Sequence, residues 1–190
     1  MAELMKNPQV MEQVQAKVRQ AFKGKSMITE SEVQQLDYLR LVMKETLRLH
    51  APVPLLVPRV ARQRCQLGRY EIQGNARLMV NAREICRDPT YWKNVEYFEP
   101  KRHWNSTLDF KGNNFEFIPF GAGRRACPGI LFGILNLELS LAQLLFHFGW
   151  KLPNGIAPNN LDMTEAFGET TRKKTNLHED IWTRTCTVLP

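Results

Sequence analysis

One ten-residue stretch decides how this chain folds: Phe120-Gly-Ala-Gly-Arg-Arg-Ala-Cys127-Pro-Gly129. It fits the pattern F-x-x-G-x-R-x-C-x-G at all five fixed positions. In a chain of this composition, a chance match is expected roughly once in ten thousand. A lone cysteine at a helix start is most often a small buried hydrophobe without chemistry. A chemical role for Cys127 therefore follows from the whole pattern and not from the cysteine alone.

The surroundings of Cys127 favour an ionised sulfur. Pro128 is a natural first residue of the apolar helix that follows, and we expect this helix to run to about Phe148. The unpaired N–H groups of its first turn and the helix dipole stabilise a thiolate, and Arg124 and Arg125 add positive charge. A thiolate in this setting binds iron, and hydrogen bonds to the sulfur set how strongly it donates electrons.

Glycines beside the cysteine leave room for a flat ligand. Gly121, Gly123 and Gly129 carry no side chain where a macrocycle must approach the backbone closely. Arg125 is placed to form a charge-assisted pair with a carboxylate on such a ligand. The sequence therefore predicts that Cys127 holds the iron of a macrocycle against this loop.

The longer segment Phe115-Glu-Phe-Ile-Pro-Phe-Gly-Ala-Gly-Arg-Arg-Ala-Cys-Pro-Gly129 resembles the haem-binding loop of the cytochromes P-450, in particular the plant A-type members of the seventy-one clan. The resemblance implies haem b with Cys127 as axial ligand and metal-bound catalytic residue, whose electron push favours O–O cleavage. It also implies contacts with the cofactor from Phe120, Gly121, Gly123, Arg125 and Gly129.

Glu45 and Arg48 form an E-x-x-R pair on one face of a predicted helix. Alone, such a pair is ordinary surface chemistry. The apolar residues around it indicate burial, however, and a buried pair needs further partners. In the cytochromes P-450 an arginine from a later segment completes a structural triad. Phe98-Glu-Pro-Lys-Arg102 resembles that segment, so the resemblance assigns the third position to Arg102, although Lys101 and His103 replace the usual Glu and Phe.

The proline-rich segment Ala51-Pro-Val-Pro-Leu-Leu-Val-Pro-Arg59 follows that helix and by itself is typical of a rigid linker. In the family this stretch passes over the haem, lines the substrate pocket and sends its arginine to a haem propionate. The resemblance therefore assigns haem contact to Arg59 and substrate contact to Val53, Leu55, Leu56 and Val57. Residues 161–168 resemble the last substrate-facing turn, with Phe167 in the pocket, and a plain surface turn explains them equally well.

Composition narrows the function classes. Lys and Arg outnumber Asp and Glu by 26 to 19, which gives a formal net charge of +7. Such a balance suits nucleic acid, an anionic membrane or an acidic protein. The basic residues are scattered and do not alternate with aromatics, so we expect no nucleic-acid binding. The cysteines lie far apart without zinc-ligand spacing, which argues against a structural zinc site and a disulfide framework.

Residue patterns predict a fold that is mainly α with small β-sheets, in the α+β class. Asn7 and Pro8 start a helix as cap and first residue, and Gly24 stops it. The apolar segment 129–150 is expected to be a buried core helix, because Glu138 at mid-bilayer would cost about 3 kcal/mol. Other expected helices cover residues 1–6, a T-x-x-E capping box at 29–32, and 37–50; expected strands cover 59–65, 70–73 and 76–81.

The resemblance also implies what the chain lacks. Residues 1–8 look like the last turns of the family's oxygen-activating helix, and residues 1–6 do not form a signal peptide. We therefore expect residues 1–190 to be a single partial domain, the C-terminal haem-binding part of the cytochrome P-450 fold with the N-terminal half and membrane anchor missing. Residues 179–190 depart from the family and form an atypical tail.

The implied function is that of a haem-thiolate monooxygenase of plant secondary metabolism. The intact protein would lie on the cytosolic face of the endoplasmic reticulum membrane, take electrons from NADPH–cytochrome P-450 reductase and use O₂ to oxidise a small lipophilic compound. We expect this chain alone to be inactive, since one face of the haem would stay open to water. Two alternatives remain: a truncated, catalytically inactive product that does not hold haem, and a basic nucleic-acid-binding module.

Overall fold

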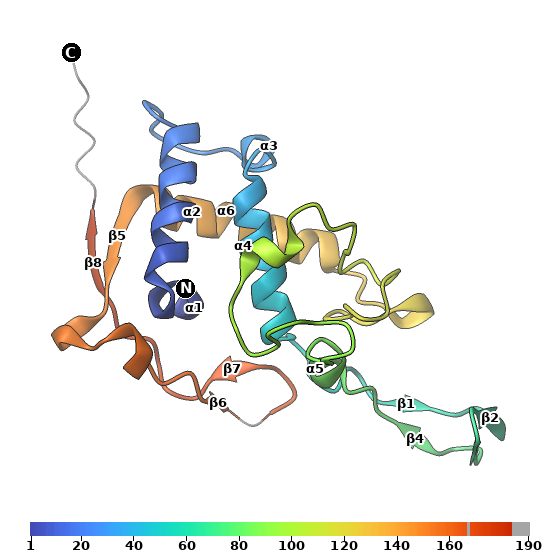
Figure 1. Ribbon diagram of the computed structural model, residues 1–190. Helices are drawn as coiled ribbons and strands as arrows, with labels where there is room; N and C mark the ends of the chain where they lie inside the picture. The colour runs from blue at the N-terminus through green and yellow to red at the C-terminus, as the bar shows by residue number, and fades with distance from the viewer. Residues whose placement is uncertain (167, 184–190) are drawn as a thin grey trace.

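The computed structural model describes residues 1–166 and 168–183, so Phe167 and residues 184–190 of the expected tail lie outside the described residues. Helices form the body of the protein, and short antiparallel strand pairs lie around and beyond it (Figure 1). The predicted class, mainly α with small β-sheets, is confirmed.

Helix α2 (Pro8–Ala21) buries the apolar face that its sequence predicts. Val14, Val18 and the C-cap residue Phe22 are almost fully buried, because a spacing of four residues places them on one side of the helix. Gly24 follows with a φ of +82°, a left-handed conformation that ends a helix readily. The short helix α1 (Ala2–Lys6) precedes α2, as expected.

Asn7 occupies the cap position of α2, but its side chain does not cap that helix. Its Nδ2 instead donates to the Glu3 carbonyl at 2.8 Å and to Glu3 Oε2 at 3.1 Å. The predicted positions of Asn7 as N-cap residue and Pro8 as first helical residue are confirmed, although the Asn7 side chain makes no cap bond to α2. The amide serves α1, whose last carbonyls also need partners.

Two further helices bring the chain back to the core. The predicted capping box starts α3 (Glu30–Val33), where Thr29 N–H donates to Glu32 Oε2 at 3.0 Å. Helix α4 (Asp37–Leu49) then packs beside α2, and both helices contact the long helix α6 (Ile130–His147). It ends at His50, just before the proline-rich segment that cannot continue a helix.

Helix α6 begins at Ile130, two residues later than expected. Gly129, with φ −92° and ψ 12°, is its N-cap, and the Gly129 carbonyl accepts from Gly133 N–H at 2.9 Å. Pro128 consequently belongs to the preceding turn. The predicted start is wrong because the fixed φ of proline suits a turn as well as a first helical residue.

The expectation that α6 is a buried core helix holds for one face. Ile134, Glu138 and Ala142 face the core, whereas Leu131 and Phe132 are exposed, and 28% of the helix is buried. By length and composition α6 could span a membrane, a test that core helices also pass. Glu138 Oε1 lies 3.4 Å from Arg40 Nε of α4, so its carboxylate is paired within the protein.

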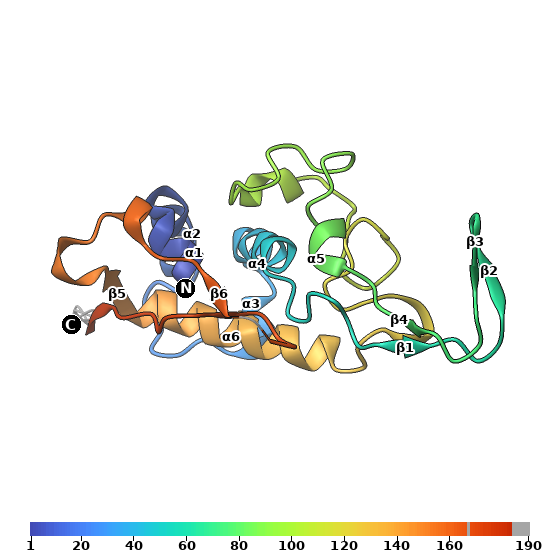
Figure 2. The same cartoon turned by 90° about the horizontal axis from the view of Figure 1, so that it is seen from below.

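A two-stranded arm extends from the body (Figure 2). Strand β1 (Arg59–Val60) pairs with β4 (Arg77–Leu78), and β2 (Cys65–Leu67) forms a hairpin with β3 (Tyr70–Ile72). The single strand expected for residues 59–65 is therefore wrong, since the chain bends between β1 and β2. A short helix, α5 (Ala82–Ile85), follows β4 and is capped by Asn81 Oδ1, which accepts from Glu84 N–H at 3.2 Å.

The C-terminal segment returns along the body. Strand β5 (Phe148–Lys151) pairs with β8 (Asp180–Thr183), and β6 (Glu165–Ala166) pairs with β7 (Arg172–Lys173). A Cβ on Gly149 would lie 2.1 Å from the Trp182 ring, so glycine is what allows this close approach of β8. The other described elements are 3₁₀ turns at Pro100–His103 (η1), Gly123–Arg125 (η2), Pro153–Gly155 (η3) and Pro158–Asn160 (η4).

Phe22→Ala tests the core between α2 and α6. The Phe22 ring packs edge-on against Phe146 at a centroid distance of 6.3 Å, and its loss should lower the free energy of unfolding by about 3–5 kcal/mol. Urea unfolding monitored by circular dichroism gives the change. Phe115→Ala, the same substitution at a 72% exposed position, is the control and should change stability little. Equal effects from both variants would contradict this packing.

Candidate functional site

The loop before Cys127 is closed by its own backbone. Cys127 N–H donates to the Phe120 carbonyl at 3.0 Å, and Gly121 N–H donates to the Ile118 carbonyl at 2.9 Å. Gly121 and Gly123 have φ values of +76° and +66°, which side chains rarely tolerate. The glycines of the motif therefore have a backbone role as well as the predicted role of leaving space.

The Cys127 side chain is exposed and turned toward the start of α6. A Cβ built on Gly129 would lie 3.9 Å from Cys127 Sγ, so the sulfur rests beside the helix cap. The first N–H groups of α6 have no partner within the helix and carry the positive end of its dipole. The sulfur thus lies near the start of α6 as expected, but the helix begins two residues later than the sequence predicts.

The donor set around Cys127 fits a haem better than a bare metal ion. Among the described residues there is no group of three or more His, Cys, Asp or Glu side chains able to hold a metal. A haem supplies four nitrogen ligands itself and needs one axial protein ligand, which an exposed thiol provides. Leu131 and Phe132, 68% and 78% exposed on the first turn of α6, add apolar surface beside that thiol.

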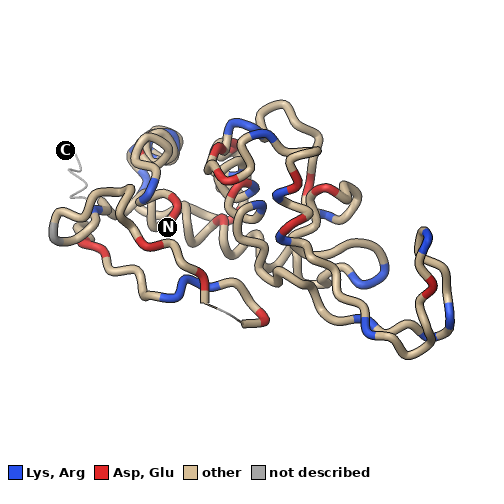
Figure 3. Tube along the Cα trace, turned by 60° about the horizontal axis from the view of Figure 1, so that its bottom comes forward, with Lys and Arg blue, Asp and Glu red and all other residues tan. Residues whose placement is uncertain are grey.

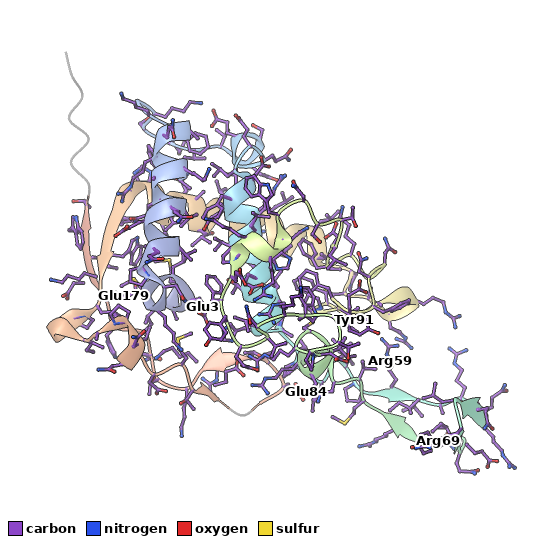
Figure 4. All side chains as sticks on the ribbon, in the orientation of Figure 1. Glu3, Arg59, Arg69, Glu84, Tyr91 and Glu179 are labelled. Carbon is purple, nitrogen blue, oxygen red and sulfur yellow. The ribbon has the colours of Figure 1, made fainter. Side chains whose placement is uncertain are left out.

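The residues predicted to bind propionates lie on separate elements. Arg125 is exposed in η2, and Arg59 is half-buried at the start of β1, where the arm leaves the body (Figure 4). Within the described residues neither guanidinium has an ion pair, so both are available to an acidic ligand. Their role at the haem remains a prediction.

The segment predicted to contact the substrate, residues 53–57, contains both buried and exposed side chains. Leu56, at φ +51°, turns inward and packs with Ala82 and Ile118, and its Cδ1 lies 3.5 Å from the position of a Cβ on Gly121. Leu55 and Val57 on either side are exposed by 42% and 74%, and Val53 is half-buried. The segment thus touches the cysteine loop through Leu56.

Glu45 is the centre of a buried ionic cluster, which confirms that the E-x-x-R pair is buried. Glu45 and Arg48 are 0% exposed, and Arg48 Nε and Nη2 donate to the two Glu45 oxygens at 3.0 Å each. Arg102 Nε donates to Glu45 Oε1 at 2.8 Å, and the Glu99 N–H donates to the same atom at 2.9 Å. The structure therefore brings the predicted triad together.

His103 is a fourth member of this cluster that the sequence did not reveal. Its Nε2 lies 2.9 Å from Glu45 Oε2, while its Nδ1 is buried without a hydrogen-bond partner. The ring stacks on Phe117 at 5.7 Å and meets Trp92 edge-on at 5.8 Å. His103 thus packs as an aromatic ring and also provides one donor to Glu45.

The two arginines also hold the irregular segment that follows α5. Arg48 Nη1 donates to the carbonyls of Cys86 and Val95 at 3.2 and 2.8 Å, and Nη2 donates to Tyr97 at 3.2 Å. Arg102 donates to the carbonyls of Lys93, Asn94 and Tyr97. All five N–H groups of Arg48 have acceptors, as a buried guanidinium requires.

Burial and hydrogen bonding act in opposite directions on the two titrating members. Burial raises the pKa of Glu45, but the bonds from His103 and Arg48 outweigh it and bring the pKa to about 2, below the ordinary 4.5. Burial lowers the pKa of His103 below 6.5, against the effect of Glu45. The cluster therefore holds an ionised Glu45 and a neutral His103 whose Nε2–H is the donor.

The motif, the loop and the buried triad are those of one enzyme family. The family model of cytochrome P-450 matches residues 1–178. The chain belongs to the cytochrome P-450 family. The match ends one residue before the tail that the sequence sets apart.

Relatives place this cytochrome P-450 in the plant seventy-one clan. It is 56% identical over 178 residues to the desmethyl-deoxy-podophyllotoxin synthase of Sinopodophyllum hexandrum, covering 94% of this chain and 35% of the relative. It is 56% identical over 177 residues to cytochrome P-450 71D10 of Glycine max, covering 93% and 35%. A melianol synthase of Citrus sinensis is 55% identical over 184 residues, covering 97% and 36%. The chain thus spans about a third of the length of these curated relatives.

Glu45→Gln tests the ionic cluster. The variant leaves two buried guanidinium groups without their counter-charge, so the free energy of unfolding should fall by about 3–5 kcal/mol. Glu99→Gln is the matched control, since Glu99 is half exposed where it meets Arg102 at 3.3 Å and should contribute at most about 1 kcal/mol. Chemical denaturation measures both. A Glu45→Gln variant as stable as Glu99→Gln would show that the cluster is dispensable.

Acidification should destabilise the protein in two steps. Both folded-state pKa values are lowered, so each group contributes stability that is complete above its ordinary pKa and is lost as the pH falls. The His103 step begins below pH 6.5, and the Glu45 step runs from about 4.5 toward about 2. Denaturation midpoints between pH 8 and 3 measure this. His103→Phe should remove the upper step and also weaken the lower one, because Glu45 loses a hydrogen-bond donor. An unchanged profile in that variant would refute the assignment.

Proposed function

We propose that this chain forms the haem-thiolate site of a plant monooxygenase, with Cys127 as the axial ligand of haem b. The observation that carries the proposal is the exposed Cys127 thiol, set at the end of a backbone-closed loop and against the cap of the apolar helix α6. Membership of the cytochrome P-450 family implies this cofactor, and the donor set fits it.

Each residue of the site then has a physical task. The first turn of α6 stabilises the Cys127 thiolate through its free N–H groups and dipole. Arg59 and Arg125 neutralise the two propionates, and Gly121 and Gly123 let the loop lie flat against the macrocycle. Haem, when bound, supplies the activation of molecular oxygen.

Aromatic side chains connect the buried cluster around Glu45 to the loop that carries Cys127. His103 stacks on Phe117, and Phe110 lies edge-on to both Phe117 and Phe120, at 6.4 and 5.9 Å. The Phe120 carbonyl accepts the hydrogen bond from Cys127 N–H that closes the cysteine loop. A rigid aromatic path thus connects the ion cluster to the thiol, which must be held accurately to bind iron.

For the longer protein we propose O₂-dependent oxidation of a small lipophilic compound, with electrons from NADPH–cytochrome P-450 reductase. Val53, Leu55, Leu56 and Val57 are the proposed substrate contacts, together with Phe167. Two relatives are named as synthases of desmethyl-deoxy-podophyllotoxin and of melianol, which supports a lipophilic plant metabolite as substrate. We place the intact protein at the endoplasmic reticulum membrane, on its cytosolic face. Basic residues lie among acidic ones along the body of the chain (Figure 3), which supports a role other than nucleic-acid binding.

A second candidate is that the 190-residue chain by itself is inactive and holds haem poorly or not at all. Phe115, Leu131 and Phe132 are each more than 65% exposed, an apolar surface that soluble monomers usually cover. The chain spans about a third of its relatives' length, so residues that close the other haem face need not lie in it. An open haem lacks the dry cavity on which oxygen chemistry depends.

Cys127→Ser distinguishes these candidates. The chain, expressed with haem supplied, should give the ferrous carbon monoxide spectrum of a thiolate-ligated haem, and Cys127→Ser should lose it. Cys65→Ser is the matched control, because Cys65 is also exposed but lies on β2 of the arm. A thiolate spectrum that persists in Cys127→Ser would refute the ligand assignment. Absence of bound haem in the wild-type chain would favour the second candidate.

A further inference from the structure

His50 lies between two carboxylates from distant parts of the chain. Its Nε2 is 2.8 Å from Glu3 Oε1 of α1 (Glu3 is labelled in Figure 4), and its Nδ1 is 2.6 Å from Glu165 Oε1 of β6. All three side chains are at least three-quarters buried. The end of α4 is therefore joined to residues 47 and 115 positions away in the sequence.

Proton counting determines the charge of this trio. A carboxylate oxygen accepts hydrogen bonds, so each of the two contacts needs a proton between its atoms. A neutral imidazole carries one N–H, whereas an imidazolium carries two. Both contacts are satisfied together when His50 is protonated, and loss of that proton leaves one carboxylate facing a bare ring nitrogen.

The charges around the trio favour the protonated form. Glu165 Oε2 also lies 3.6 Å from Arg83 Nε of α5, and Glu3 Oε2 accepts from the Asn7 amide at 3.1 Å. The side chains of Glu3, His50, Arg83 and Glu165 border a cavity of about 680 Å³. The charged residues that line it, apart from His50, are Glu3, Glu84, Glu96 and Glu165 against Lys6, Arg83 and Arg87. One positive charge on His50 makes this lining neutral.

The segment that carries Glu165 is also joined to the segment after α4 by Thr171. Thr171, after β6, donates its N–H to the Pro52 carbonyl at 2.9 Å and its hydroxyl to the Ala51 carbonyl at 2.6 Å. Leu55 and Ala166 line the cavity from the two segments that these bonds join. Both segments are those proposed above to face the substrate.

We propose that His50 is a positioning residue whose protonated ring clamps β6 and the following turn against α1 and the segment after α4, and so sets the shape of the cavity between them. The inference rests on the proposed function only where it takes this cavity to face the substrate. The clamp itself depends on neither haem nor Cys127, so its test and that of the thiolate ligand can fail separately.

The direction of the pH effect follows from the contacts. Burial lowers the pKa of His50, but the bonds to Glu3 and Glu165 prevail and raise it above the ordinary 6.5. A raised folded-state pKa means that the clamp contributes its full stability below pH 6.5 and loses it as the pH rises through the folded-state pKa. Alkaline conditions therefore release β6 and the turn.

The proton on His50 can be observed directly. Nitrogen-15 NMR of the imidazole rings in the full chain should show both His50 nitrogens protonated at pH 6.5, with a titration midpoint above that of an unstructured histidine. Glu165→Gln should move the midpoint down, whereas Glu84→Gln, on the same cavity wall but paired with Arg83, should move it less. A neutral His50 ring at pH 6.5 in the wild-type chain would overturn the proposal without reliance on any variant.

The release of β6 and the following turn can be measured by limited proteolysis with trypsin. The wild-type rate of cleavage after Arg172, divided by that after Arg69 in the exposed β2–β3 turn, should rise about tenfold between pH 6 and pH 9, as expected for a lost charged hydrogen bond. His50→Gln should show a high ratio at both pH values, since glutamine does not titrate. A wild-type ratio that does not change with pH, or a His50→Gln ratio like the wild type at pH 6, would overturn the clamp.

Discussion

The buried Glu45 carboxylate is the constraint on which the arrangement of this chain depends. It lies in the core, where an unpaired charge would be very costly, and it is matched by donors from Arg48, Arg102 and His103. The two arginines use their remaining N–H groups on peptide carbonyls between residues 86 and 97, where the chain has no sheet or long helix to satisfy them. One carboxylate thereby orders an irregular segment that lacks regular secondary structure.

Packing contacts extend from this cluster to the loop that carries Cys127. His103 contacts Phe117, whose neighbour Phe110 contacts Phe120, and the Phe120 carbonyl closes the loop that carries Cys127. Leu56 reaches this loop from the other side, next to Gly121. The family motif and the E-x-x-R pair are thus parts of one packed unit, although the central Glu45 lies 82 residues before Cys127 in the sequence.

Sequence reasoning succeeded where a local pattern decides the structure. The apolar period of α2, the capping box before α3 and the end of α4 before the prolines all follow from neighbouring residues. It was wrong where two conformations suit the same residue, as with Pro128 before α6. It could not reveal His103 or His50, because their partners come from remote segments and a lone histidine carries no local signal.

The two buried histidines favour opposite protonation states, because their ring nitrogens have different partners. His103 has one carboxylate partner and one bare nitrogen, so the neutral ring suits its site and it behaves as a polar substitute for an aromatic residue. His50 has a carboxylate at each nitrogen, so the charged ring suits its site. The support of the Cys127 loop is consequently insensitive to alkaline pH, while the wall of the neighbouring cavity is not. A rigid cysteine loop beside a pH-dependent cavity wall allows the shape of the cavity to change without moving the sulfur.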